Sequence, residues 1–199
     1  ISGPTASGKS NLALKIAGII GGQIINADSM QVYRELKILT ARPSKEDQNK
    51  IKHHLYGHQS GNKRYNVYNW CTECLDKINE IIKDIKVPIV VGGTGLYFHA
   101  LINGIVKMPS IPEKIKNEST IELSVKGWDN LFRELKQLDE ESVLKIKKND
   151  SQRLKRVWEV IKHTGIPLSQ WQKKINNNFI ENYNYNLILI LPDRKSLYS

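Results

Sequence analysis

Near its beginning the chain carries the stretch that decides its fold class, Gly3-Pro4-Thr5-Ala6-Ser7-Gly8-Lys9-Ser10. The stretch fits the pattern G-x-x-x-x-G-K-[ST], which is typical of a loop whose backbone N–H groups wrap phosphate oxygens. In such a loop glycines let the backbone approach the anion, Lys9 neutralises charge on the terminal phosphate, and Ser10 offers its hydroxyl to Mg²⁺. Chance produces such a match in roughly one chain of this length in a hundred, so we predict a phosphate-binding loop over residues 3–10.

The segments that flank this loop predict strands alternating with helices. Ile1 and Ser2 resemble the end of a strand, and residues 9–20 place their apolar side chains on one helical stripe. Short apolar strands are predicted over residues 23–26 and 87–91, with a helix over residues 67–85 between them. This alternation is typical of a parallel α/β sheet.

Ligands of parallel α/β sheets collect beyond the carboxyl ends of the strands. The loop at 3–10, Asp28 and Thr94 all follow predicted strands, so we expect these three segments to converge. Asp28 could hold Mg²⁺ or accept a proton, and the alternative is an ordinary helix N-cap. The turn at residues 92–95 could make a second contact to the same anion, and the alternative is a plain tight turn.

The strand pattern stops at about residue 107 and gives way to charged amphipathic helices. One apolar stripe comprises Trp128, Leu131, Leu135 and Leu138. A strand pattern returns at residues 186–191 and is closed by Pro192. We therefore predict an α/β core over 1–106, a helical insertion over 107–176 with a flexible joint at 176–178, and a return to the core over 177–199.

A second candidate site lies in the insertion, at the sequence Asp150-Ser151-Gln152-Arg153-Leu154-Lys155-Arg156. Asp150 is predicted to cap a helix whose apolar face, beginning with Leu154, packs inward. Gln152, Arg153 and Arg156 then share another face, and arginine side chains suit phosphates and base edges. A solvated charged face is the alternative interpretation.

Composition adds weaker indications. Lysine and arginine number 30 against 20 acidic residues, which favours polyanionic partners, although compositional drift would produce the same excess. Cys71 and Cys74 fall within a predicted helix, and we favour reduced cytosolic thiols over a redox pair. A metal site at His53, His54 and His58 is not favoured, because acidic or cysteine ligands do not accompany them.

The apolar runs at residues 88–91 and 187–191 have the length of strands, so no membrane-spanning segment is predicted. A signal peptide pattern is also missing, and we expect a cytoplasmic protein. Because an initiator methionine is missing as well, we expect the N-terminus to be trimmed.

Taken together, the motifs resemble those of the tRNA dimethylallyltransferase family. In order along the chain from Gly3 to about Arg194 they are GPTASGKS, INADSMQVYR, TARPS, HHL, PIVVGGTGLYFHALING and NDSQRLKRVWEVIKHTGIPLSQWQ. The resemblance implies a core like that of P-loop nucleoside triphosphate hydrolases, carrying a helical insertion. It also implies that dimethylallyl diphosphate places its pyrophosphate on residues 5–10, assisted by Thr94 and Mg²⁺. The acceptor would be the adenosine 3′ of the anticodon in the tRNA anticodon stem-loop, flipped out of its stack.

The family pattern also assigns roles to individual residues. Asp28 matches the general base and, with Thr94, the catalytic residues. The matches to stretches that contact tRNA are Thr94, the run Asp28, Ser29, Met30 and Gln31, and the run Gln152, Arg153, Leu154, Lys155 and Arg156.

The chain also departs from the family pattern. Where the family reads I-H-P-N-D-P-Q-R, residues 146–153 read Ile146-Lys147-Lys148-Asn149-Asp150-Ser151-Gln152-Arg153. Family members also continue beyond the position of Ser199 with further arginines and a T-R-Q segment, so we expect a truncated chain. We expect a monomeric enzyme. The open alternatives are an isopentenyltransferase or kinase for a free nucleotide, and an inactive truncated fragment that still binds nucleotide or RNA.

Overall fold

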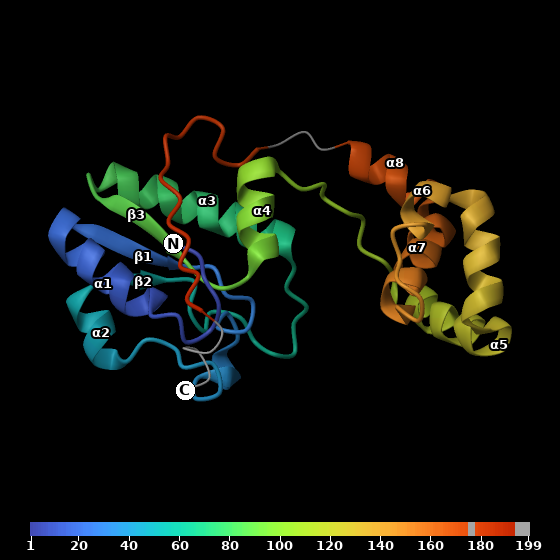
Figure 1. Cartoon of the computed structure of the whole chain (residues 1–199), viewed down its shortest axis with the longest axis horizontal. Coiled ribbons are helices and arrows are strands. Elements are labelled where there is room, and N and C mark those ends of the chain that lie inside the picture. The colour runs from blue at the N-terminus through green and yellow to red at the C-terminus, as the bar shows by residue number, and fades with distance from the viewer. Residues whose placement is uncertain (175–177, 194–199) are drawn as a thin grey trace. The chain divides into compact units, whose positions relative to one another are not determined.

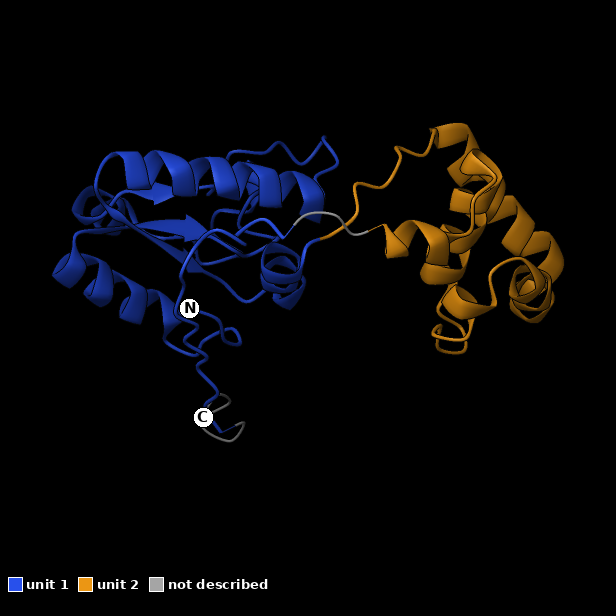
Figure 2. Cartoon of the chain, turned by 90° about the horizontal axis from the view of Figure 1, so that it is seen from above, with its two compact units in different colours: residues 1–104, 178–199 blue, residues 105–177 orange. Residues whose placement is uncertain are grey.

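The computed structural model describes residues 1–174 and 178–193 (Figure 1). The chain divides into two compact units, the first comprising residues 1–104 and 178–199 and the second residues 105–177 (Figure 2). Each unit has its own buried apolar cluster. The units are described separately below.

A parallel sheet forms the centre of the first unit. Its strands are β1 (Gly22–Asn26), β2 (His53–His54) and β3 (Val87–Val91), in the order β2-β1-β3. In the register of the sheet, Ile24 of β1 lies opposite His53 on one side and Ile89 on the other. Ser2 extends the sheet beyond β3, because it bridges in parallel to both Gly92 and Leu189. The α/β prediction is therefore confirmed.

Helices cover both faces of this sheet. They are α1 (Lys9–Ile20), α2 (Lys45–Lys50), α3 (Val67–Lys83) and α4 (Gly95–Asn103), together with the 3₁₀ turn η1 (Arg34–Leu36). Figure 1 shows α1 on one side of β1 and β3 and α3 on the other. The predicted stripe of α1 buries Ala13 and Ala17 completely, against an apolar cluster that includes Ile24, Ile89 and Val91. Gly21 ends this helix, because its left-handed backbone lets its N–H bond back to the carbonyl of Ala17.

Helix α3 stops earlier than its apolar pattern predicts. The predicted helix over 67–85 included Ile85, but the helix ends at Lys83 and the Ile85 side chain is 96% exposed. Ile85 has a left-handed backbone, with φ 56, and the N–H of Lys86 bonds to the carbonyl of Ile81. This closing turn redirects the chain into β3, and it removes Ile85 from the buried face.

The second unit is entirely helical in its described residues. It contains α5 (Glu113–Leu138), α6 (Glu140–Val143), α7 (Ser151–Thr164) and α8 (Leu168–Lys173), and α5 is interrupted by non-helical backbone at Gly127. The core contains Leu131, Leu135, Val143, Leu154 and Val157. The predicted stripe was wrong at Leu138, which is 53% exposed. Asp139, immediately after Leu138, leaves helical geometry and ends the helix before the stripe can continue.

The predicted strand over residues 186–191 is reduced to a single bridge at Leu189. The Ser2 N–H donates to the carbonyl of Ile188 at 2.8 Å, and the Ile190 N–H donates to the carbonyl of Ser2 at 2.8 Å. The pairing goes no further because its partner turns at Gly3 into the glycine loop. The predicted joint at 176–178 lies mostly outside the described residues.

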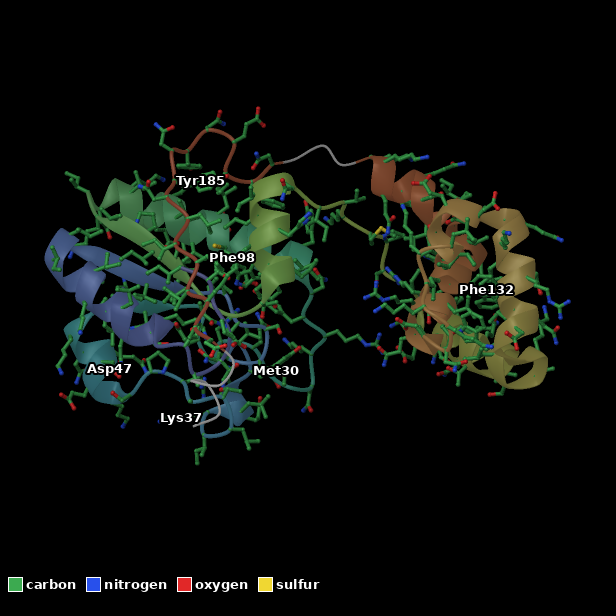
Figure 3. All side chains as sticks on the ribbon, viewed as in Figure 1. Met30, Lys37, Asp47, Phe98, Phe132 and Tyr185 are labelled. Atoms are coloured by element: carbon green, nitrogen blue, oxygen red, sulfur yellow. The ribbon has the colours of Figure 1, made fainter. Side chains whose placement is uncertain are left out.

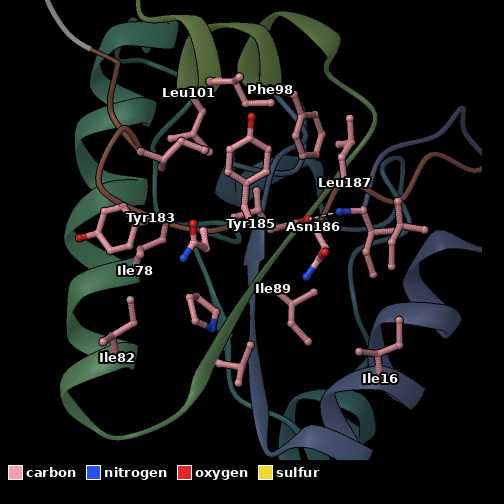
Figure 4. Close-up of a pocket in the computed structure, with 18 of the residues that line it drawn as sticks. Ile16, Ile78, Ile82, Ile89, Phe98, Leu101, Tyr183, Tyr185, Asn186 and Leu187 are labelled. Carbon is pink, nitrogen blue, oxygen red and sulfur yellow. Dashed lines mark hydrogen bonds between the residues drawn. The ribbon is translucent and has the colours of Figure 1, made fainter.

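An apolar cavity of about 390 Å³ lies between β3, α3, α4 and residues 180–188 (Figure 4). Figure 4 shows Ile78, Ile89, Phe98, Leu101 and Tyr185 around it. Within the described part of the chain, its lining includes neither the loop at 3–10 nor Asp28 nor Thr94. This cavity is therefore separate from the predicted phosphate site.

Candidate active site

The glycine loop combines left-handed backbone with the beginning of a helix. Ala6 and Gly8 have φ values of 64 and 79, and α1 begins at Lys9. The first N–H groups of an α-helix have no partner within the helix, so they face whatever lies beyond its N-terminus. Lys9 is half-buried, and its ammonium donates to the carbonyl of Pro4 at 2.9 Å, which folds the side chain back over the loop. The loop thus gathers N–H donors and one cation around a small volume.

Gly3 allows the loop to pass close to neighbouring backbone. A Cβ atom built on Gly3 would lie 2.8 Å from both the carbonyl oxygen of Ile190 and the hydroxyl of Ser7. Any larger residue would push the loop away from the sheet. The exposed positions of the loop are Pro4, Thr5, Ala6, Gly8 and Ser10.

Asp28 follows β1 and is held by a buried asparagine. Asn26 is fully buried, and its amide nitrogen donates to the carbonyls of Asp28 and Leu55, each at 3.0 Å. The Asn26 amide oxygen accepts the N–H of Asp28 at 2.9 Å. Three hydrogen bonds from one side chain therefore fix where the Asp28 backbone leaves the sheet.

The Asp28 carboxylate caps a turn and not a helix. Its Oδ1 accepts the N–H groups of Met30 and Gln31, at 2.9 and 3.4 Å. Residues 29–32 form turns, and the next helical segment, η1, begins only at Arg34. The helix N-cap interpretation is therefore wrong, although the carboxylate does satisfy nearby backbone donors.

The turn at residues 92–95 packs directly against the turn after β1. A Cβ atom on Gly92 would lie 2.0 Å from the carbonyl oxygen of Ala27, so only glycine fits there. The Thr94 hydroxyl oxygen accepts the N–H of Ser29 at 2.9 Å, and the Thr94 N–H donates to the carbonyl of Ala27 at 3.2 Å. The position of a Cβ atom on Gly93 is 3.9 Å from the Lys9 ammonium. The structure thus brings the loop, Asp28 and Thr94 together at the carboxyl edge of the sheet.

Electrostatic effects link these groups to two buried tyrosines. Burial lowers the pKa of Lys9, while the negative charge of Asp28 acts in the opposite direction. Burial raises the pKa values of Tyr56 and Tyr97, and in both the charge of Asp28 adds to the rise. Asp28 therefore lies within electrostatic reach of one cation and two neutral phenols.

Sequence reasoning missed the buried support of this site. Trp70 is fully buried and stacks on Tyr97 with ring centroids 4.3 Å apart, and its indole N–H donates to the carbonyl of Asn26 at 2.8 Å. The available signals were an asparagine at the end of an apolar strand and aromatic residues in two helices. Neither signal identifies a contact between residues so far apart in the chain.

The residues present fit a magnesium ion at this edge. Ser10 presents an exposed hydroxyl at the start of α1, and Asp28 contributes a carboxylate. Mg²⁺ prefers such oxygen ligands and commonly binds through one or two protein groups together with substrate phosphates and water. In the described residues, no group of three or more histidine, cysteine or acidic side chains could hold a metal alone.

The histidines bond to other groups, and the cysteines are buried. His53 bonds to the carbonyl of Ile51, and His58 bonds to the carboxylate of Glu73 at 2.8 Å. Both cysteines are buried free thiols, and burial raises the pKa of Cys71 to about 12. Such thiols are unreactive at neutral pH.

The second candidate site occupies the first turns of α7, in the other unit. Asp150 caps this helix as predicted, accepting the N–H of Arg153 at 3.1 Å. Gln152 and Arg153 are exposed, while Lys155 and Arg156 are half-buried. The Leu154 side chain is completely buried in the core, so its side chain does not reach the surface predicted to meet tRNA.

Neighbouring groups partly neutralise the two arginines. The Arg153 guanidinium lies 3.0 Å from Asp150, and that of Arg156 lies 3.7 Å from Glu159. Both pairs are solvent-accessible, so their energies are small and a phosphate could replace either carboxylate.

No described helix is long and apolar enough to span a bilayer.

A glycine loop preceding a helix, with a carboxylate and a threonine at the same edge of a parallel sheet, is consistent with an α/β protein of P-loop-like fold. The comparison with family models identifies it further. The model described as IPP transferase matches residues 31–199, and the model described as isopentenyl transferase matches residues 1–59. The chain belongs to the IPP transferase family.

Individual relatives agree with this assignment. The chain is 49% identical over 179 residues to the tRNA dimethylallyltransferase of Pelagibacter ubique, covering 90% of this chain and 57% of that protein. It is 40% identical over 198 residues to the tRNA dimethylallyltransferase of Allorhizobium ampelinum, covering 100% of this chain and 65% of the relative. The chain therefore spans less than two thirds of the length of these relatives.

Two solved structures also resemble this chain. A eukaryotic dimethylallyltransferase acting on tRNA superposes with a TM-score of 0.71 at 31% identity, covering 88% of this chain and 44% of that one. The full-length tRNA isopentenylpyrophosphate transferase from Bacillus halodurans superposes with a TM-score of 0.51 at 32% identity, covering 83% of this chain and 55% of that one.

Proposed function

We propose that this chain carries the donor-binding and catalytic part of a tRNA dimethylallyltransferase. The observation that supports the proposal most strongly is the meeting of Lys9, Asp28 and Thr94 at one edge of the sheet. Hydrogen bonds between Asn26 and the Asp28 backbone, and from the Ser29 N–H to Thr94, hold the two turns that bring them together. The Lys9 ammonium and the backbone N–H donors, which can bind an anion, thus lie beside Asp28, which can accept a proton from the acceptor.

The donor is dimethylallyl diphosphate, with its pyrophosphate on residues 5–10. The backbone N–H groups at the start of α1 bind the phosphate oxygens, and Lys9 leaves the carbonyl of Pro4 to pair with the anion. Thr94 holds the turn after β3 against the turn after β1, next to this loop. Mg²⁺, held by Ser10 and phosphate oxygens, would supply further neutralisation of the leaving group when bound.

Asp28 acts as the general base. The exocyclic nitrogen of the adenosine attacks the allylic carbon, a carbon–nitrogen bond forms, and the bond from that carbon to the diphosphate oxygen breaks. The bonding electron pair leaves with pyrophosphate, and the amine proton passes to Asp28. Both backbone hydrogen bonds to this carboxylate end on Oδ1, so we assign the proton to Oδ2.

The acceptor is the adenosine 3′ of the anticodon, flipped out so that its amine can reach Asp28. Residues 28–31 and Gln152, Arg153, Lys155 and Arg156 of α7 are the proposed tRNA contacts. The chain's formal net charge of +10 supports a polyanionic partner. We further propose that the enzyme works as a monomer in the cytoplasm.

The decisive experiment offers the protein labelled dimethylallyl diphosphate with Mg²⁺ and one of two acceptors. One is an anticodon stem-loop with adenosine 3′ of the anticodon, and the other is AMP. We expect label on the stem-loop only, and none when that adenosine is replaced by guanosine. Label on AMP instead would assign the chain to the free-nucleotide class, and label on neither acceptor would contradict transfer by this chain.

A further inference from the structure

Outside the phosphate loop, the first unit carries a further cation beside the start of α1, Arg42 in the stretch Thr40-Ala41-Arg42-Pro43-Ser44. Arg42 lines a second cavity of about 280 Å³ together with Ser10, Asn11 and Tyr56. Asp47 of α2, labelled in Figure 3, also lines this cavity. The cavity therefore joins the first turn of α1 to the segment that carries Arg42.

The Arg42 guanidinium is held in a defined place. Its Nη2 donates to the carbonyl of Arg34 at 2.8 Å. A Cβ atom on Gly57 would lie 1.5 Å from Nη1, so the absence of a side chain at Gly57 makes room for the guanidinium. Gly57 also has a left-handed backbone, with φ 56, which glycine adopts without strain.

The same segment is tied to the turn that carries Asp28. The Gln31 side-chain amide donates to the carbonyl of Thr40 at 2.8 Å, and the Gly57 N–H donates to the carbonyl of Gln31 at 2.9 Å. Asp28 in turn accepts the N–H of Gln31. A short chain of hydrogen bonds thus fixes the guanidinium relative to the proposed base.

Among the described residues, part of the donor capacity of Arg42 has no hydrogen-bond partner. Its Nε is fully buried and has no hydrogen-bond partner. Within the described residues no carboxylate lies within ion-pair distance of this guanidinium, and the nearby Glu35 instead accepts the N–H of Gly61 at 3.0 Å. A guanidinium that is positioned by backbone contacts and left unpaired is suited to an anionic ligand, which it binds through a planar fork of N–H groups.

We propose that Arg42 is a second phosphate-binding residue of this site, which contacts the donor diphosphate from the side of Ser10 while Lys9 contacts it from the loop. This inference rests on the proposed function. Negative charge accumulates on the departing pyrophosphate as the carbon–oxygen bond breaks, and Lys9 supplies a single positive charge. Arg42 would add a second fixed charge, with its orientation set by Arg34 and Gly57.

The test is calorimetric titration of the protein with inorganic pyrophosphate in the presence of Mg²⁺. Arg42→Gln should lower the affinity by about 10- to 100-fold, since hydrogen bonds from a charged group to the anion are lost. Arg42→Lys should restore only part of it, because an ammonium cannot reproduce the planar fork. The matched control is Arg34→Gln, an exposed arginine of the same segment whose backbone alone contacts Arg42, and it should bind pyrophosphate normally.

A second variant keeps the Arg42 charge and displaces it, while alanine at the left-handed Gly57 also strains the backbone. Gly57→Ala places a methyl group where Nη1 lies, so it should weaken pyrophosphate binding as Arg42→Gln does, with circular dichroism and urea unfolding to confirm folding. Normal pyrophosphate binding by Arg42→Gln would overturn the proposal. If Arg42→Gln binds pyrophosphate normally but binds the stem-loop more weakly, the proposal is also overturned, and Arg42 is assigned to an RNA phosphate instead.

The outcome for Lys9→Ala separates this proposal from the proposed function. If Lys9→Ala loses pyrophosphate binding and Arg42→Gln does not, the anion site stands and the assignment of Arg42 fails. If the unaltered protein fails to bind pyrophosphate, both fail together. Loss of binding in both variants, with Arg34→Gln unaffected, is the result that we expect.

Discussion

The hydroxyl oxygen of Thr94 accepts the backbone N–H of Ser29 at 2.9 Å, across 65 positions of the chain. This bond joins the turn after β3 to the turn after β1, next to the residue proposed as the base. The Thr94 hydroxyl also lies 3.3 Å from the hydroxyl of Ser29. Thr94 is therefore positioned to act through its neighbours as well as through any direct contact to the donor.

Thr94→Val tests this connection, because valine keeps the shape of threonine and removes the hydroxyl. The Ser29 N–H loses its partner, so the free energy of unfolding should fall by about 1 kcal/mol. Transfer to a stem-loop should slow as well, since the turn that carries Asp28 is less constrained. Urea denaturation and single-turnover transfer measure the two effects. Thr94→Ser, which retains the hydroxyl, should recover most of both, and a valine variant with unchanged transfer would leave Thr94 without a positioning role.

Lys9→Ala should abolish binding of pyrophosphate and of the donor while leaving the fold intact. The ammonium is half-buried and contacts only the carbonyl of Pro4 by hydrogen bond, so no apolar core is disturbed on its removal. Calorimetry with pyrophosphate measures the binding, and thermal unfolding checks the fold. Retention of full affinity would refute the anion site.

The arginines of α7 should contribute to tRNA affinity through phosphate contacts. If Arg153 and Arg156 each neutralise one phosphate, Ala at either position should reduce the slope of log affinity against log salt by about 0.7 to 0.9. Arg133→Ala is the control, because that exposed arginine of α5 bonds within its own helix to Asn130. Slopes that do not change in the α7 variants would favour a solvated charged face.

His54 should make the first unit less stable in mild acid. Burial lowers the pKa of His54, and the positive charges of Lys52 and Lys77 lower it further. Its neutral ring bonds to the Gln23 side chain at 2.6 Å. Because the folded pKa lies below the unfolded value of about 6.5, the stabilisation is present above that value and is lost as pH falls through the folded pKa.

The measurement is the free energy of unfolding in urea from about pH 8 down to pH 5. We expect stability to decline at the acidic end. His54→Asn should flatten the decline, and the remaining slope would come from groups such as His53, whose pKa burial also lowers. Identical pH dependence in the two proteins would show that His54 does not couple protonation to folding.

The elements of the first unit could largely be predicted from sequence because their boundaries are encoded locally. The apolar period of α1 starts after the glycine loop and ends at Gly21, where a left-handed residue is needed. The apolar run of β3 is likewise closed by glycines, of which Gly92 is required by its approach to Ala27. In these cases the apolar pattern that indicates a helix or strand and the glycine that ends it lie within a few residues of each other.

The sequence predictions failed where the local backbone conformation, or a contact between residues far apart in the chain, decides whether a side chain is buried and what it touches. Ile85 and Leu138 continue their apolar stripes in sequence, but the backbone leaves α3 before Ile85, and Leu138, the last residue of α5, stays half exposed. The bond between Thr94 and Ser29, and the position of Arg42 over Gly57, join segments whose approach depends on the sheet as a whole. The motifs therefore predicted which segments meet at the edge of the sheet, but they did not predict which side chains hold these segments together.

The Asp28 carboxylate has three roles to be distinguished, as the base, as a ligand of Mg²⁺ and as the cap of its turn. Asp28→Asn separates the three roles, because asparagine keeps an oxygen for the N–H of Met30 and removes the basic site. The capping bond survives, so the free energy of unfolding should change by less than about 1 kcal/mol. Lys9 loses a nearby opposite charge, but its contact to Pro4 remains.

If Asp28 is the base, the Asn variant should transfer the dimethylallyl group about 10²- to 10⁴-fold more slowly, with little change in donor affinity. A carboxylate that mainly held Mg²⁺ would give a different result, because donor affinity would fall together with the rate and added magnesium would partly restore both. Single-turnover transfer to an anticodon stem-loop measures the rate, and calorimetry measures donor binding on the same preparation. Glu46→Gln is the control, since it makes the same change from carboxylate to amide at an exposed residue of α2 that pairs with Lys50 and lies outside the proposed donor and tRNA contacts. Near-normal transfer by Asp28→Asn would remove the catalytic role and leave Asp28 as the cap of its turn.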